Sequence, residues 1–156
     1  MPSVELELAP TWDRVAGVVQ EARAFFASAG VDPEAAEAMG MIATELCENA
    51  VKYGKREPVR LQLHARDTEL VVDVSNAIDE RAVRHVSRIA DTLTWMKSFV
   101  DPFHAYVARM KMVSSQELES FESGLGLLRV AAEGQAVLSF KLDGNRVVTV
   151  SATRPR

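Results

Sequence analysis

The segment from Asp32 to Tyr53 predicts one long amphipathic helix, and this helix limits what the chain can fold into. Asp32 is a suitable N-cap, and Pro33 stands at the first helical position, where its missing N–H costs nothing. Gly54 is expected to end the helix in the left-handed conformation. At about 100° per residue the apolar side chains share one arc; they are Met39, Ile42, Leu46, Ala50 and Tyr53. This arc must be buried against another layer.

Five short segments alternate between apolar and polar residues, which predicts strands with one buried face. They span residues 4–8, 59–65, 69–76, 136–142 and 146–152. Asp143-Gly144-Asn145, between the last two segments, is a strong signal for a hairpin turn. The chain is therefore expected to close on a β-hairpin.

Helical periodicity fills most of the remaining sequence. It covers residues 11–30, residues 79–113 with a break at Asp101-Pro102, and the run that follows the glycines at 124 and 126. The order of elements predicts an α+β two-layer sandwich, in which helices pack on one face of a mixed, mostly antiparallel sheet. With 156 residues, of which 47% are hydrophobic, the chain is expected to form one domain over residues 1–156.

Composition excludes several classes of function. The net charge is -4, and the basic residues are scattered, so neither nucleic acid nor an anionic membrane is predicted as a partner. Cys47 is the single cysteine, which excludes an internal disulfide and a multi-cysteine metal site. The N-terminus lacks a basic segment followed by an apolar signal core, so we expect a cytoplasmic protein without a membrane span.

Three polar residues interrupt the apolar pattern of the long helix. Glu45, Asn49 and Lys52 fall at roughly 0°, 40° and -20° around the helix axis. They share one narrow stripe at the edge of the buried arc, where a cleft could form. The alternative interpretation is an ordinary polar pair one turn apart, followed by a solvated lysine.

A second feature is the sequence "GLGL", from Gly124 to Leu127. Gly124 and Gly126 permit close approach of the backbone, and the start of the following helix leaves free N–H groups that suit phosphate oxygens. Taken alone, a glycine pair before a helix is more often only a turn.

Together, "ELCENAVKYG" and "GLGL" resemble the N-box and the second glycine box of the GHKL ATPase superfamily, whose fold is the histidine kinase-like, or Bergerat, ATPase fold. The order of elements and the terminal hairpin are similar to the single-domain bacterial anti-sigma-factor serine kinases. The resemblance implies ATP and Mg²⁺ as cofactors. It implies that Glu45 polarises the attacking hydroxyl or water, that Asn49 holds Mg²⁺, and that Lys52 lies near phosphate.

The first glycine box of that superfamily, D-x-G-x-G, has no close match here. In "VVDVSNAIDE", the parity of the strand places Asn76 where the family has the adenine-reading aspartate, and Ile78 and Glu80 where it has glycines. An alignment from Asp73 instead points the carboxylate to the other side of the strand. The carbonyl of the Asn76 amide is suited to accept the adenine N–H, although it lacks the charge of aspartate.

Residues 79–123 correspond to the nucleotide lid of that family, and here they are rich in apolar side chains. Among these are Trp95, Met96, Phe99, Val100, Phe103, Tyr106, Val107 and Met110. Such a segment either completes the core or forms an interface with a partner or a second copy of the chain.

The resemblance favours a regulatory protein that binds Mg-ATP and a protein partner, either a sigma factor or an anti-sigma antagonist. If it is an enzyme, it is an ATP-dependent protein serine/threonine kinase or an ATPase of a partner-switching pathway. The alternative is a non-catalytic interaction module on the same fold, in which loss of the first glycine box has removed nucleotide binding. A third alternative is an unrelated α/β domain whose helix carries the triplet by chance.

Overall fold

One five-stranded sheet runs through the molecule in the order β1-β2-β3-β5-β4. The computed structural model describes residues 1–116, 125–144 and 146–156. The strands are β1 (Ser3–Leu8), β2 (Val59–Ala65), β3 (Glu69–Ala77), β4 (Val137–Asp143) and β5 (Val147–Pro155). Each neighbouring pair in this sheet is antiparallel, so the described strands contain no parallel pair. The predicted strands and the closing hairpin are confirmed.

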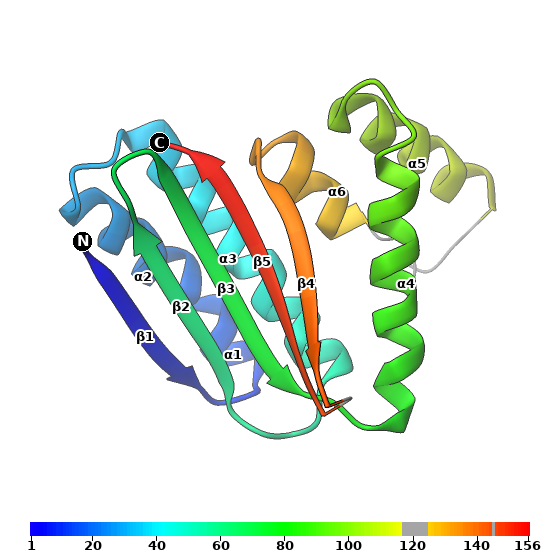
Figure 1. The fold of residues 1–156 in the computed structure, drawn as a ribbon, viewed down its shortest axis with the longest axis horizontal. Coiled ribbons are helices and arrows are strands. Elements are labelled where there is room, and N and C mark those ends of the chain that lie inside the picture. The colour runs from blue at the N-terminus through cyan, green and yellow to red at the C-terminus, as the bar shows by residue number, and fades with distance from the viewer. Residues whose placement is uncertain (117–124, 145) are drawn as a thin grey trace.

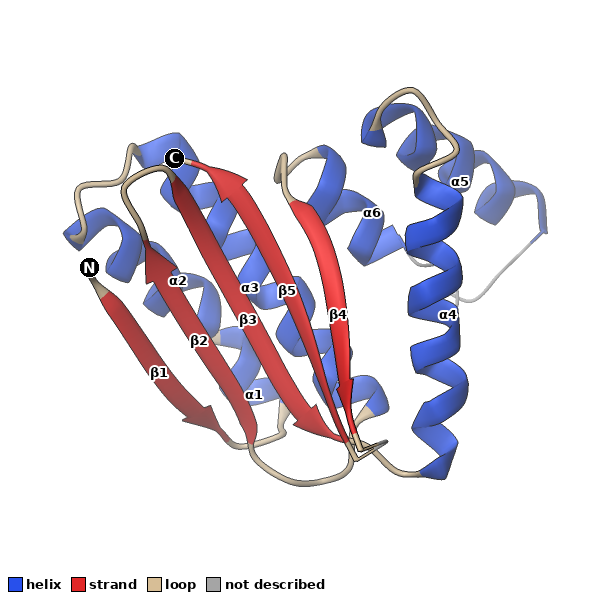
Figure 2. Ribbon diagram, in the orientation of Figure 1, coloured by secondary structure: helices blue, strands red, loops and turns tan. Residues whose placement is uncertain are grey.

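Six helices accompany the sheet in the part of the chain that the structure describes. They are α1 (Trp12–Ala16), α2 (Val18–Ser28), α3 (Pro33–Tyr53), α4 (Glu80–Met96), α5 (Pro102–Gln116) and α6 (Leu125–Ala132). Figure 1 shows α1, α2, α3 and α6 behind the sheet, with α4 and α5 at the β4 end. The front face of the sheet carries no helix (Figure 2), so the fold is the predicted two-layer α+β arrangement. Within the described residues, no helix is both long and apolar enough to span a membrane.

Helix α3 forms the centre of the helical layer. Its N-cap Asp32 accepts hydrogen bonds from the backbone N–H groups of Glu34 and Ala35, as the sequence predicts. Four of the five residues on the predicted arc are buried, namely Met39, Ile42, Leu46 and Ala50, whereas Tyr53 is only partly buried. The helix therefore packs its apolar arc on the sheet and leaves the polar stripe at the boundary.

Two predictions about the backbone are wrong. The helix expected over 11–30 is divided at Gly17, because the Gly17 N–H donates to the carbonyls of Arg14 and Val15 and ends α1 after little more than one turn. Gly54 does end α3, but in an extended conformation with φ -80° and ψ 170°, not in the left-handed region. A glycine is needed there for space: an added Cβ would lie 2.5 Å from Asn76 Nδ2 and 2.6 Å from the Ala50 carbonyl oxygen.

The segment equivalent to the lid has two different sides. On one side of α4, Val86, Ile89 and Leu93 are buried in the same core as α3 and the sheet. On the other side of the segment, Val100 and Phe103 are 98% and 62% exposed. The interpretation as core is therefore correct for one side of α4, while the α4–α5 corner is exposed in this chain. The end of the segment, residues 117–124, lies outside the described residues.

We expect Gly54→Ala to lower the free energy of unfolding by about 1–3 kcal/mol, because the added methyl overpacks the junction between α3 and β3. Gly17→Ala is the matched control, since its Cβ would meet no atom closer than 3.6 Å. Urea denaturation of the parent and both variants measures the effect. Equal midpoints for Gly54→Ala and Gly17→Ala would contradict the close contact.

Candidate functional site

The polar stripe of α3 lies where the helix leaves the core. Glu45 and Asn49 are half-buried, and Lys52 is exposed. The Glu45 side chain retains 20% exposure, so its carboxylate is accessible but flanked by protein. The stripe predicted from helical geometry is therefore present at the edge of the buried arc.

A small cavity lies between α3, the sheet and α4. Its volume is about 20 Å³, which is room for one water molecule. Asn49 and Asn76 provide its polar wall. The apolar lining consists of Leu46, Ala50, Val74, Ile78, Val86, Ile89, Val148 and Val150, and Tyr53 completes it. The two asparagines, 27 positions apart in sequence, thus face the same space.

Asn49 keeps its amide uncommitted. No hydrogen bond joins the Asn49 side chain to the other residues that the structure describes. A free amide oxygen is a suitable ligand for a hard cation such as Mg²⁺, and the Glu45 carboxylate one turn away is suited to accept a proton. The chemistry of the Asn49 and Glu45 side chains therefore fits the Mg²⁺ and ATP that the resemblance implies.

Asn76 points inward from β3, as the predicted parity requires, and is 7% exposed. Its Nδ2 donates to the Ala77 carbonyl oxygen at 3.3 Å. Asp73 lies on the uncovered face instead, where its carboxylate accepts a hydrogen bond from Ser151 and pairs with His64. Of these two residues, Asn76 lines the cavity and Asp73 does not.

Ile78 and Glu80, which the strand parity aligns with the two glycines of the first box, differ in burial. Ile78 is 4% exposed and forms part of the cavity wall. Glu80 is exposed at the start of α4 and does not line the cavity. Ile78 therefore fills space beside Asn76, whereas Glu80 does not.

Glu45 contacts α6 at two places, a hydrogen bond from Arg129 in the last turn and the backbone of Gly126 at the start. Arg129 Nη1 donates to Glu45 Oε1 at 3.1 Å, and Arg129 Nε donates to Glu133 Oε2 at 2.8 Å. An added Cβ at Gly126 would lie 2.7 Å from Glu45 Oε2, so any side chain at this position would displace the carboxylate. Glu45 and Gly126 are predicted from the sequence, whereas Arg129, three positions after Gly126, has no sequence signal of its own. Gly124 lies outside the described residues.

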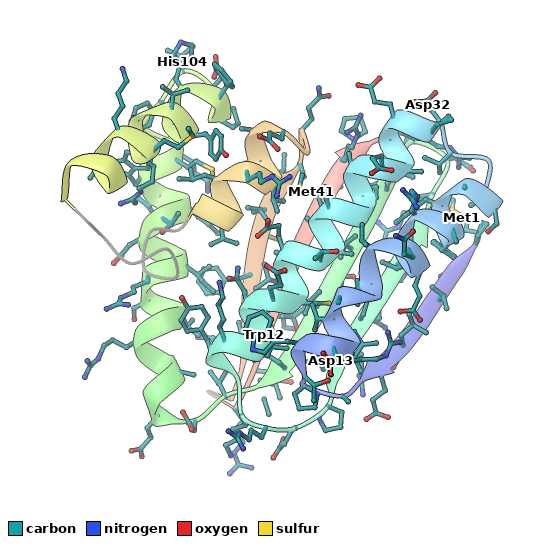
Figure 3. All side chains as sticks on the ribbon, turned by 180° about the vertical axis from the view of Figure 1, so that it is seen from behind. Met1, Trp12, Asp13, Asp32, Met41 and His104 are labelled. Carbon is teal, nitrogen blue, oxygen red and sulfur yellow. The ribbon has the colours of Figure 1, made fainter. Side chains whose placement is uncertain are left out.

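Lys52 faces away from the cavity and toward α1. Its Nζ lies 5.9 Å from the centre of the Trp12 ring, within the range of a cation–π interaction. Figure 3 shows Trp12 beside the end of α3. Trp12 is 52% exposed, so this pair lies at the surface. No local sequence pattern predicts this pair, because Lys52 and Trp12 are 40 positions apart.

Burial raises the pKa values of two titratable groups on α3, Glu48 and Cys47. Desolvation raises the pKa of Glu48, and the neighbouring Glu45 carboxylate raises it further, against the opposing effects of Lys52 and Arg129. Burial raises the pKa of the Cys47 thiol to about 12, so the thiol is protonated at neutral pH. Cys47 is therefore a core residue of α3 and not a nucleophile.

Comparison with known proteins agrees with this geometry. Residues 8–132 match the family model of the histidine kinase-like ATPase domain, which is well over half of the chain. This protein therefore belongs to the histidine kinase-like ATPase domain family. The matched region contains α3, β3 and α6, the three elements that carry Glu45, Asn76 and Gly126.

The fold also matches solved structures, of which fourteen chains are similar. One is a chain from the crystal structure of the SiaB–SiaC complex of Pseudomonas aeruginosa. It has a TM-score of 0.59 and 15% sequence identity, and the match covers 98% of this chain and 89% of that chain. At this identity the likeness establishes a common fold. A search of the curated proteins found no match.

We expect the native protein to react very slowly with a thiol reagent such as Ellman's reagent. Cys47 is fully buried, and its raised pKa leaves almost no thiolate in mildly alkaline buffer. In concentrated urea the same thiol should react at the rate of a free cysteine. Because Cys47 is the single cysteine, no labelling site has to be assigned. Rapid titration of one thiol per native chain would contradict the buried position.

Proposed function

We propose that this protein is a signalling regulator that binds a protein partner and takes up ATP with Mg²⁺ beside Glu45, Asn49 and Asn76. The observation that carries the proposal is the placement of Asn49 and Asn76 around one cavity, with Glu45 and Gly126 in contact nearby. Membership of the histidine kinase-like ATPase domain family supports a nucleotide as the ligand.

Each side chain has a role in this proposal. The Asn49 amide oxygen would hold Mg²⁺, and the Asn76 carbonyl would accept the adenine N–H. Gly126 and Gly124 would let the backbone approach phosphate, and Lys52 would contact phosphate after leaving Trp12. Bound Mg²⁺ would neutralise charge on the transferring phosphoryl group. Glu45 would accept the proton of a serine hydroxyl on a protein substrate.

A protein partner is supported by two observations. The similar chain described above comes from a complex of two proteins, SiaB and SiaC. In this chain, Val100 and Phe103 expose apolar surface at the corner between α4 and α5. The resemblance to anti-sigma regulators suggests a sigma factor or an anti-sigma antagonist, and a second copy of this chain is the other candidate.

A second candidate function is a non-catalytic interaction module. The cavity of about 20 Å³ is far too small for an adenine ring, and Ile78, Val86 and Ile89 fill the space. Nucleotide could enter only if α4 moved away from α3, which would expose these three side chains. In an interaction module α4 stays in place, and the protein acts through its surface alone.

Isothermal calorimetry with ATP, with and without Mg²⁺, separates the two functions. We expect the parent to bind ATP, and Asn49→Ala to lose only the part of the affinity that depends on Mg²⁺, because the amide oxygen is the proposed ligand. Gln62→Ala is the control, since Gln62 lies on the uncovered face of the sheet, where it hydrogen-bonds Glu5. Absence of ATP binding by the parent under both conditions would leave the interaction module.

If the protein turns over ATP, Glu45→Ala should lower the rate by about 10²-fold or more without weakening ATP binding. The reason is that a general base acts mainly in the transition state. A phosphate-release assay with the parent, Glu45→Ala and Glu37→Ala measures this. Glu37 lies on the same helix but pairs with Arg23, so it is the matched control. Equal rates for Glu45→Ala and the parent would remove Glu45 from the mechanism.

A further inference from the structure

Arg129 connects the two sequence motifs of the site through its side chain. Its guanidinium donates to Glu45 on α3 and to Glu133, the residue directly after α6, at 3.1 Å and 2.8 Å. Glu45 and Arg129 are 84 positions apart, so this contact exists only in the folded chain. Arg129 is thus the side chain that joins α6 to the polar stripe of α3.

The Glu45 carboxylate has one hydrogen bond to Arg129 and lies close to the backbone of Gly126. Oε1 accepts from Arg129, and Oε2 lies where the Cβ of any other residue at position 126 would clash. The hydrogen bond directs Oε1 toward Arg129 and so limits rotation of the carboxylate. The contact therefore fixes Glu45 in a resting position.

The same contact is weak enough to be exchanged. The side chains of Arg129 and Glu45 are 44% and 20% exposed, and ion pairs of this kind contribute little because water screens them. A guanidinium has five N–H donors in a fixed fork that suits phosphate as well as carboxylate. A phosphate anion that reached Arg129 would take over the donors now used by Glu45.

We propose that Arg129 is a positioning residue that holds Glu45 against the start of α6, and that a phosphate anion competes with Glu45 for the same guanidinium. Arrival of the anion then frees the carboxylate. The identity of the anion as the phosphates of ATP rests on the proposed function. The hold on Glu45 and the competition do not, because both concern side chains of this chain and any phosphate.

The test uses inorganic tripolyphosphate, which has no adenine, in calorimetric titrations without Mg²⁺. Glu45→Gln releases Arg129, so it should bind tripolyphosphate more tightly than the parent, by up to about fivefold. Glu48→Gln is the matched control, because it removes one carboxylate from the same helix but no hydrogen bond to Arg129. The double variant Glu45→Gln/Arg129→Gln should lose the gain, and Glu45→Gln/Arg129→Lys should recover part of it.

Three results would overturn the inference. One is an equal affinity in Glu45→Gln and the parent, the second is an equal gain in Glu48→Gln, and the third is a gain that survives Arg129→Gln. Hydrogen exchange gives a readout without any anion: amides in the last turn of α6, which carries Arg129, should exchange faster in Glu45→Gln and in Arg129→Gln, with no further increase in the double variant. ATP binding by the parent tests the proposed function separately, so failure of one is distinguishable from failure of the other.

Discussion

Burial of one arc of α3 against the sheet is the interaction on which the rest of this structure depends. Met39, Ile42 and Leu46 are almost completely buried between α3 and the sheet. Since a helix turns by about 100° per residue, packing this arc also fixes the direction of the neighbouring polar stripe. Gly40 lets α3 lie close to α2, where an added Cβ would be 3.0 Å from the Val19 carbonyl oxygen. The core and the candidate site are therefore two sides of the same helix.

The candidate site is closed by contacts within the chain. Lys52 lies over Trp12, Glu45 pairs with Arg129, and α4 fills most of the space beside Asn49. Each of these contacts would have to be exchanged for one with a ligand. The proposed nucleotide uptake and the proposed competition at Arg129 are both exchanges of this kind.

The two candidate functions differ in what they require of the α4–α5 segment. Val86 and Ile89 close the cavity from one side of α4, while Val100 and Phe103 are exposed at the corner that follows. A partner that binds this corner acts on the same helix that covers Asn49 and Asn76. Partner binding and nucleotide binding would then be coupled through the position of α4, whereas in an interaction module α4 would serve the partner alone.

The sequence by itself determined the strands, α3 with its N-cap and buried arc, and the inward direction of Asn76, because these follow from local periodicity and capping chemistry. It also named Glu45, Asn49 and Gly126 through the resemblance to a known family. Only the tertiary structure decided that α4 fills the cavity and that Arg129 and Trp12 become partners of Glu45 and Lys52. These contacts join residues far apart in the chain, so their existence depends on how complete elements pack, which no local pattern records.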